Sequence, residues 1–166
     1  MNDNQNGNGQ VSDGDILTVG AFAGLSPEDS RLFASYGEVV GLTGGEVLIE
    51  QGREQGSLFV VLSGKLRASL RSEMIAVDLG LVTPGETIGE MSIVDPNPAS
   101  ATVTVLESGT AWQIDRGRFQ DFIRRHPESG NSLLNGLAAQ LARRLRRASG
   151  QLIRLGEFRC AAFEFL

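Results

Sequence analysis

The stretch PGETIGEMSIVDPNPASATV, residues 84–103, joins two apolar runs through a glycine, a short polar segment and a pair of prolines. We expect a strand to end at Ile88 and Gly89, residues 90–94 to form one helical turn, and DPNP to make a turn before the next strand. A glycine followed by a short helix directs backbone N–H groups and the positive end of a dipole toward one point. The stretch therefore has the layout of an anion cradle, although it contains no positively charged side chain.

The surrounding residues 38–114 consist of short apolar runs that glycine or proline interrupts every eight to twelve residues, which is typical of an all-β sandwich or barrel. Leu66, Ala68 and Leu70 alternate with polar residues, so one face of their strand is expected to be buried. Ser63 and Gly64 fit a tight hairpin corner that joins this strand to the preceding one. The expected strands are residues 39–42, 47–50, 58–63, 65–71, 76–82, 87–89, 101–106 and 110–114.

A short helix is expected before the strands. Ser26 fits the N-cap of this helix, Pro27 its first residue and Gly37 its stop, while Leu32 and Phe33 are its apolar anchors.

Two further helices are expected after the strands. Asp115 can cap the first, which places Phe119, Phe122 and Ile123 on one face and ends at Pro127. The second is expected over residues 129–155, and it has an apolar stripe with no evident partner. The stripe consists of Leu134, Leu137, Leu141, Leu145, Ala148, Leu152 and Leu155.

The composition limits the class of protein. A chain of 166 residues with 41% hydrophobic and 21% charged residues can bury one core, and residues 1–15 are too polar to be more than a disordered tail. No apolar run is long enough to span a bilayer and no signal layout opens the chain, so a cytoplasmic protein is expected. Cys160 is the only cysteine, which excludes an intrachain disulfide and a cysteine metal cluster.

Catalytic chemistry has little support in this sequence. His126 is the only histidine, and it stands at a helix end where a histidine is ordinary. Without a second histidine or clustered aspartates, neither a serine–histidine nucleophile nor a multi-histidine metal site is supported. We predict no enzyme activity, no catalytic residue, no metal and no resident cofactor.

Four motifs, in order, resemble the cyclic-nucleotide-binding domain family, the regulatory module of catabolite-activator-like transcription factors, cyclic-nucleotide-dependent kinases and gated channels. They are GEVLIEQG (45–52), LFVVLSGKL (58–66), the stretch 84–103 and AWQIDRGRFQDFIRRHPE (111–128). The resemblance covers residues 22–145 and implies a mainly β fold. This fold is an eight-stranded antiparallel β-roll, jelly-roll-like, with one helix before it and two after it.

The resemblance also divides the chain and assigns a candidate ligand site. The expected parts are the tail 1–15, the β-roll with flanking helices 16–128, a lid or dimerisation helix 129–155 and an apolar tail 156–166. In the family, the phosphate-binding cassette typically reads FGE, a short helix and then PRAATV or a variant such as RSA. The matching candidate residues for cyclic AMP or cyclic GMP are Gly89, Glu90, Met91, Ser92, Ala99, Ser100 and Ala101.

Within this cassette, the resemblance makes Glu90 the ribose-binding acid, although a lone acid in a loop also serves as a solvated or capping residue. It makes Ser100 the residue whose backbone amide meets the phosphate. Ala99, however, stands where the family places its phosphate-binding arginine. Losing two charge-assisted bonds would weaken binding by about 3 to 5 kcal/mol, unless another arginine reaches the site. The candidates for this rescue are Arg53, Arg67 and Arg71, each of which also fits a solvated surface charge.

The end of the chain leaves several alternatives open. Residues 143–166 carry six arginines against Glu157 and Glu164 and can meet nucleic acid, meet an anionic partner, or form the wet side of a dimer helix. Only eleven residues follow Leu155, so a helix-turn-helix is not expected. In other family members this helix is a lid over the base, for which Ser149 or an arginine could serve. The tail can pack on the roll, dock on a partner or be non-native.

Two functions follow from these observations. The first is a regulatory module that keeps the fold but binds cyclic nucleotide weakly or not at all and acts through a homodimer or a partner protein. The second is a working cyclic AMP or cyclic GMP sensor that signals by moving its C-terminal helices.

Overall fold

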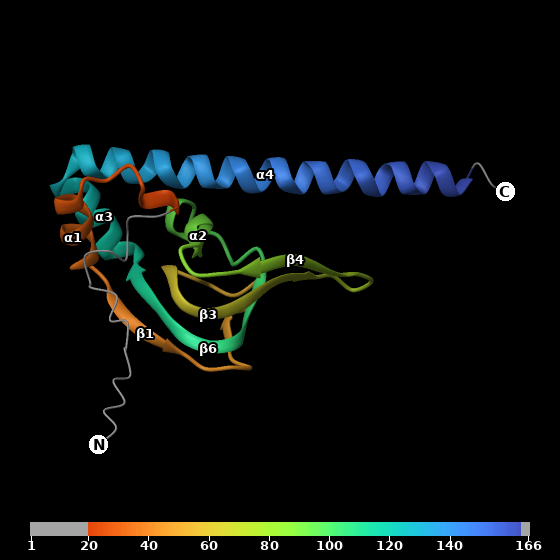
Figure 1. Cartoon of the computed structure of the whole chain (residues 1–166), viewed down its shortest axis with the longest axis horizontal. Coiled ribbons are helices and arrows are strands. Elements are labelled where there is room, and N and C mark those ends of the chain that lie inside the picture. Colours follow the sequence, from red (N-terminus) through yellow and green to blue (C-terminus); the bar gives the residue numbers. More distant parts are fainter. Residues whose placement is uncertain (1–19, 164–166) are drawn as a thin grey trace, which may run out of the picture.

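The computed structural model describes the backbone of residues 20–163 and the side chains of residues 20–150 (Figure 1). The predicted tail 1–15 and the side chains of Leu152 and Leu155 lie outside these described residues. The elements are η1 (Gly20–Phe22), α1 (Pro27–Ala34), β1 (Glu38–Leu42), β2 (Val47–Ile49), β3 (Ser57–Arg71), β4 (Ala76–Val82), β5 (Thr87–Ile88), α2 (Glu90–Val94), β6 (Thr102–Asp115), α3 (Arg116–Arg125) and α4 (Pro127–Phe163).

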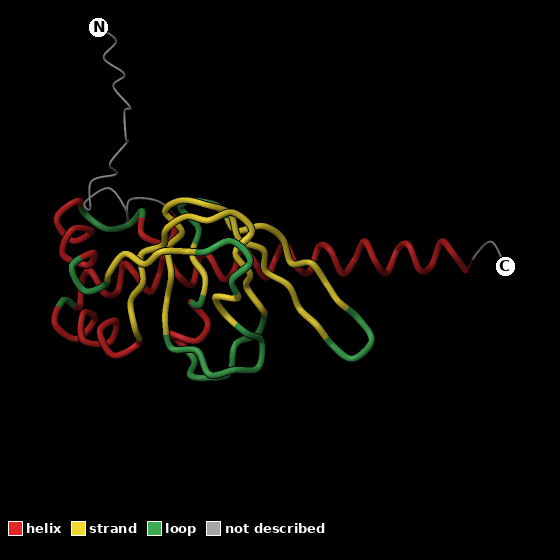
Figure 2. Tube along the Cα trace, turned by 90° about the horizontal axis from the view of Figure 1, so that it is seen from below, coloured by secondary structure: helices red, strands yellow, loops and turns green. Residues whose placement is uncertain are grey.

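The strands form one antiparallel sheet that curls into the predicted β-roll. Its strand order is β1-β6-β3-β4, with β2 also paired to β6 and β5 to β3. The two long strands β3 and β6 form the central pair and run through the whole roll, with β4 at the sheet's edge (Figures 1 and 2). The mainly β, antiparallel fold class with flanking helices is confirmed, with six continuous strands in the described part in place of eight.

The predicted hairpin corner at Ser63 and Gly64 is wrong. Gly64 lies inside the continuous strand β3, where its φ of 90° and several register shifts against β6 mark an irregular bend. A Cβ on Gly109 would lie 2.1 Å from the carbonyl oxygen of Ser63, so two glycines allow β3 and β6 to bend together at close approach. The predicted runs 58–63 and 65–71 are therefore one strand, and so are 101–106 and 110–114.

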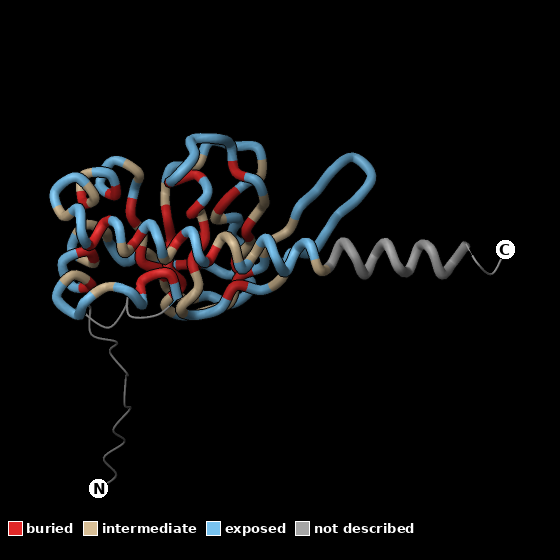
Figure 3. The backbone as a smooth tube through the Cα atoms, turned by 90° about the horizontal axis from the view of Figure 1, so that it is seen from above, coloured by how far each residue is buried: buried red, intermediate tan, exposed pale blue. Residues whose placement is uncertain are grey.

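The interior contains two apolar clusters. One lies within the roll and includes Leu66, Val82 and Val105, and the other joins the roll to the helices around Phe33 and Trp112. Figure 3 shows buried backbone segments both in the roll and in the helices. In α1, Ser26 is the N-cap as predicted and accepts a hydrogen bond from the Asp29 N–H. Phe33 is fully buried, but Leu32 is exposed, so only one of the two predicted anchors of α1 is buried.

Helix α3 agrees with its prediction, because Asp115 caps it and Phe119 and Phe122 are buried. Helix α4 begins at Pro127 and continues to Phe163, beyond the predicted end at residue 155 and through most of the predicted apolar tail. It passes over the roll, packs on η1 and α3, and extends beyond them (Figure 1). No described helix is long and apolar enough to cross a membrane.

The predicted leucine stripe of α4 is divided between two surfaces. Leu133, which the prediction omitted, and Leu137 are buried against the rest of the domain, whereas Leu134 and Leu145 are exposed and Leu141 is half-buried. The helix face that contacts the roll is therefore offset by one residue from the predicted stripe, and Leu137 is not available to a partner.

Candidate functional site

The candidate cassette begins at Gly89, between β5 and α2. Gly89 has φ of 82° and would place a Cβ 2.2 Å from the Ser57 carbonyl oxygen, so both its backbone conformation and its close approach require glycine. Helix α2 follows at once as the predicted single helical segment, with Gly89 as its N-cap. The start of the cassette thus has the geometry expected from the sequence.

Glu90, the predicted ribose acceptor, is 3% exposed and already has a partner. Its Oε1 accepts a hydrogen bond from Nη1 of Arg144, which lies on α4. The Nη2 of the same guanidinium donates to the carbonyl oxygen of Thr87. A carboxylate taken out of water needs such a partner, and here the partner comes from the C-terminal helix.

A second polar side chain of α4 reaches the same place. Gln140, one turn before Arg144, donates from Nε2 to Oγ1 of the fully buried Thr87 at 2.5 Å. We call the contacts of Gln140 and Arg144 with Thr87 and Glu90 the α4 latch. The latch closes this part of the cassette with groups of the protein itself.

Helix α2 is also held by the first residue of α3. Arg116 donates from Nε to the Ser92 carbonyl oxygen at 3.0 Å, with a second bond from Nη2 to the same oxygen. Ser92 is buried, whereas the Met91 side chain is exposed and its sulfur contacts Oγ of Ser100 at 3.4 Å. The contact of Met91 with Ser100 joins the two halves of the cassette.

Ala99, at the position of the family's phosphate-binding arginine, is 7% exposed and packs in the apolar cluster of the roll. Its N–H donates to the Arg53 carbonyl oxygen and its carbonyl oxygen accepts from the Gly52 N–H, both at 2.8 Å. Ser100 is exposed and Ala101 is half-buried. The position therefore supplies a buried methyl group and no charge.

The three arginines considered as replacements are exposed, and two of them form ion pairs outside the cassette. Arg53 pairs with Glu50 and Arg67 with Asp78, each at 3.5 Å and largely exposed. Arg71 is exposed, and its backbone N–H is bound by Gln51. The structure brings none of these three guanidinium groups into the described contacts of the cassette. The guanidinium that is found there belongs to Arg144.

Sequence reasoning missed Arg144 as a cassette residue. The available signal was its spacing from Leu133, Leu137 and Gln140, because residues three or four apart share one helix face. The leucines at 134, 141 and 145 instead predicted that a neighbouring face of the helix would be the apolar one.

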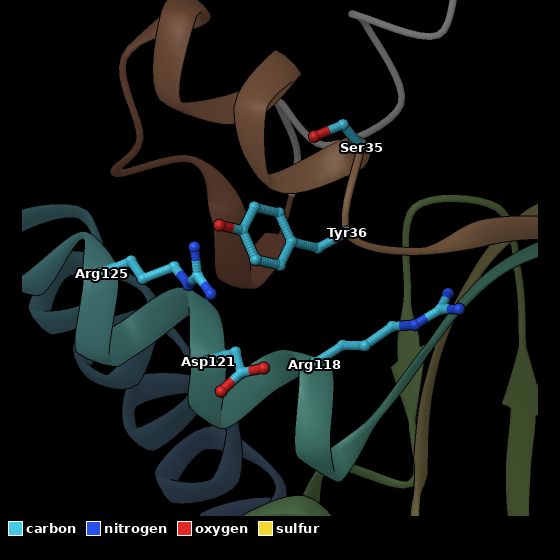
Figure 4. A pocket seen from close by; sticks show the side chains of 5 residues that line it. All are labelled: Ser35, Tyr36, Arg118, Asp121 and Arg125. Carbon is cyan, nitrogen blue, oxygen red and sulfur yellow. The ribbon is translucent and has the colours of Figure 1, made fainter.

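A concavity at the other end of the domain lies between α1 and α3. Ser35, Tyr36, Arg118, Asp121 and Arg125 line it, and Figure 4 shows Ser35 and Arg118 pointing away from its centre. Arg118 also pairs with Asp115, and Asp121 with Arg124. The charged groups do not converge on one point, so they form no evident ligand site.

Polar ties join α1 to the start of α4. Oγ of Ser129 donates to Oδ1 of Asp29 at 2.7 Å, and the Tyr36 hydroxyl and Nε2 of His126 are 3.3 Å apart. The hydrogen bond from Ser129, helped by Ser26 and by the nearby His126 charge, holds the pKa of Asp29 below its ordinary value of 3.8. His126 is the C-cap of α3, a structural position as the sequence indicates.

Comparison with known proteins agrees with this fold. Residues 39–126, just over half of the chain, match the family model described as the cyclic nucleotide-binding domain. The chain belongs to this family.

Among curated relatives, the Cyclic AMP receptor protein of Thermus thermophilus is 35% identical over 79% of this chain and 59% of its own length. The CRP-like cAMP-activated global transcriptional regulator of Mycobacterium tuberculosis is 28% identical over 82% of this chain and 60% of its length. This chain thus spans about 60% of the length of these two relatives. The crystal structure of the Thermus thermophilus Catabolite Activator Protein matches with a TM-score of 0.72 and 34% identity, over 82% of this chain and 62% of that one.

The same domain also occurs beside other activities. Glutaminase 2 of Bradyrhizobium diazoefficiens is 34% identical over 66% of this chain, but the match covers only 17% of that protein. Proteins with this kind of domain therefore include one named as a transcriptional regulator and one named as an enzyme.

Proposed function

We propose that this chain is a non-enzymatic regulatory module of the cyclic-nucleotide-binding domain family whose α4 stays on the cassette without a ligand. Cyclic nucleotide binds it weakly or not at all. One observation carries the proposal: Glu90, the group that a ribose would need, is buried and already bound to Arg144.

Two features lower the affinity for a cyclic nucleotide. The ligand must displace Arg144 from Glu90, and it finds at Ala99 no guanidinium for its phosphate. A missing pair of charge-assisted bonds weakens binding by about 3 to 5 kcal/mol, which is on the order of a hundred- to several-thousandfold in Kd.

The module acts through contacts of α4 with a second copy or a partner protein. An apolar row on α4 has the three- and four-residue spacing of a helix–helix seam. It consists of Leu134, Ala138, Leu141, Leu145 and Ala148. Leu152 and Leu155 continue the spacing beyond the described side chains. Because Leu134 and Leu145 remain exposed in the single chain, the seam is free to receive another helix.

A sensor is the second candidate, and the position of the latch favours it. The same Arg144 that covers Glu90 belongs to the helix that would have to move, so a ligand that takes Glu90 also releases α4. The Thermus relative, named as a cyclic AMP receptor protein, supports this reading by similarity.

Isothermal titration with cyclic AMP and cyclic GMP separates the two candidates. We expect no binding heat from the native chain at micromolar protein, and micromolar binding by Ala99→Arg once its melting curve shows that it is folded. Heat at micromolar concentrations from the native chain would establish the sensor instead. If Ala99→Arg fails to fold, the titration of the native chain alone separates the two candidates. Arg144→Ala, which frees Glu90, is then the additional variant to titrate.

A further inference from the structure

Helix α4 contains a run of arginines that no nearby acidic residue offsets. Residues 129–156 contain no aspartate or glutamate, although the whole chain has 20 of them. Within this stretch Arg143, Arg146 and Arg147 are exposed and form no ion pair among the described side chains. Residues three and four positions apart are neighbours on a helix, and like charges at this spacing destabilise it. The run therefore lacks an anion that would stabilise it.

Several surface arginines elsewhere in the domain are arranged differently. Three of them pair with an acid that lies three positions earlier in the chain, and the pairs are Glu50 with Arg53, Asp115 with Arg118 and Asp121 with Arg124. The sequence supplies an acid beside these arginines and none beside those of α4. An anion that neutralises the run in α4 has to be added to it.

Ser149 offers a place for such an anion. It lies three residues after Arg146 and two after Arg147, within the sequence LRRASG of residues 145–150. Its side chain is exposed, and no described side chain binds its hydroxyl group. A serine that follows two arginines suits a protein kinase with an acidic substrate groove, because carboxylates of the groove pair with the guanidinium groups.

The place of Ser149 on α4 allows a kinase to reach it. The α4 latch holds the helix at Arg144, and the later part of the helix extends past the roll (Figure 1). A Cβ added at the neighbouring Gly150 would meet no other part of the described chain within 4 Å. Serine and glycine are weak helix formers, so the helix opens more easily here than where buried leucines anchor it. Such an opening lets the segment around Ser149 enter an active site in an extended conformation.

We propose that Ser149 is a phosphorylation site for an arginine-directed serine kinase and that its phosphate pairs with Arg146. The kinase transfers the γ-phosphoryl group of Mg·ATP to Oγ of Ser149: the Oγ–P bond forms, the bond from the γ-phosphorus to the bridging oxygen breaks, and ADP leaves. The hydroxyl proton goes to the catalytic carboxylate of the kinase. The proposal depends neither on the seam nor on cyclic nucleotide.

The phosphate changes the charge of α4 where the helix is most basic. A phosphoserine carries about −1.5 to −2 charges at pH 7 and three acceptor oxygens. Arg146 lies three positions earlier on the same helix face, and its planar guanidinium can bind two of these oxygens. Phosphorylation therefore supplies the missing anion and lowers the positive charge that this part of α4 presents to a partner.

Phosphorylation of the folded full chain tests the acceptor. The probe is the catalytic subunit of cyclic AMP-dependent protein kinase with Mg·ATP, and tandem mass spectrometry locates the phosphate. We expect Ser149 to be the main acceptor and Ser149→Ala to lose nearly all of the incorporated phosphate. The double variant Arg146→Gln with Arg147→Gln should slow the reaction about a hundredfold, because two charge-assisted bonds to the kinase are lost. Arg124→Gln with Arg125→Gln, an exposed arginine pair on α3, is the matched control and should leave the rate unchanged.

A free peptide of residues 141–153 measures how far the helix protects Ser149. We expect the full chain to react no more than about a hundredfold more slowly than the peptide, since opening beyond the latch is local. A larger difference, or phosphate mainly at another serine, overturns the site.

The chain isolated from its own cells with phosphatase inhibitors shows whether the site is used. Cleavage after Arg147 and Arg154 releases the peptide of residues 148–154, which contains Ser149 as its only serine. We expect this peptide to be found with a phosphate. Its recovery in the unmodified form alone contradicts the proposal.

Phosphorus-31 NMR of the phosphorylated chain tests the pairing with Arg146. A guanidinium beside the phosphate favours the dianion, so the second pKa of the phosphate, ordinarily about 6, should be lower in the native chain than in Arg146→Gln. Both proteins are phosphorylated to completion with excess kinase. Arg143→Gln, six positions from Ser149, should keep the native pKa. Equal phosphate pKa values in the native chain and in Arg146→Gln would overturn the pairing.

Discussion

At its base, helix α4 is held by buried leucines, whereas at its middle it is held by polar side chains. Leu133 and Leu137 are within the cluster that includes Phe22 and Phe122, and a ligand has no means of competing with such contacts. Two turns further on, Arg144 reaches Glu90 and Thr87, which are groups that a polar ligand could bind.

The difference between the base and the α4 latch indicates where regulation can act. Apolar packing gives the helix a fixed pivot, since it depends only on area removed from water. The α4 latch depends on a few directed bonds, each of which has an alternative partner in solvent or in a ligand. A change in the cassette can therefore release the far part of α4 while its base remains in place.

The largest effect is expected at the base. Leu133→Ala should lower the free energy of unfolding by about 2 to 5 kcal/mol, because it removes a fully buried side chain and leaves a cavity. Urea unfolding measures this change. Leu106→Ala, at an exposed position outside the α4 seam, is the matched control and should cost less than about 1 kcal/mol. Equal costs would show that the base is not the apolar anchor described.

A smaller effect is expected in the latch. Gln140→Ala leaves the buried hydroxyl of Thr87 without this partner and should cost about 1 to 3 kcal/mol in the same urea experiment. Asn135→Ala, at an exposed site on the same helix, serves as its control. If Gln140→Ala costs as much as Leu133→Ala, the contrast between base and latch fails.

The smallest effect is a pH dependence at the junction of α1 and α4. Because the pKa of Asp29 is lowered in the folded state, its ionised form stabilises the fold above its ordinary value of 3.8. This contribution is lost as the pH falls through the lowered pKa. Melting temperatures between pH 2.5 and 7 should therefore fall less steeply below pH 4 in Asp29→Asn than in the native chain. An unchanged slope in Asp29→Asn would exclude this contribution.

Much of the fold could be predicted because its signals are local. The glycine of the cassette, the Asp115 cap and the strand alternation around Leu66 each depend on neighbours in sequence. Ser63 and Gly64 were misassigned because a serine–glycine pair suits a hairpin turn and a bent strand equally well. Only the facing Gly109, distant in sequence, decides between them.

The sequence was sufficient to predict the backbone layout of the candidate site, but not which charged side chain contacts it. The place of Ala99 in the motif was enough to identify it as the position where the family's arginine is missing. Arg144 could not be assigned to Glu90, because 54 residues separate them and the contact depends on how α4 is rotated over the roll. That rotation is set by whether Leu133 or Leu134 is buried, which the leucine spacing alone does not determine.

Hydrogen exchange at the cassette most directly tests the claim that Arg144 holds α4 on it in the ligand-free protein. In Arg144→Ala, we expect the amides of residues 87–94 and 138–145 to exchange at least about tenfold faster than in the native chain, because the variant loses charged hydrogen bonds that oppose local opening. The base around Leu133 should be unchanged, and Arg143→Ala, its exposed neighbour, should resemble the native chain throughout. Native exchange rates at the cassette in Arg144→Ala would contradict the α4 latch.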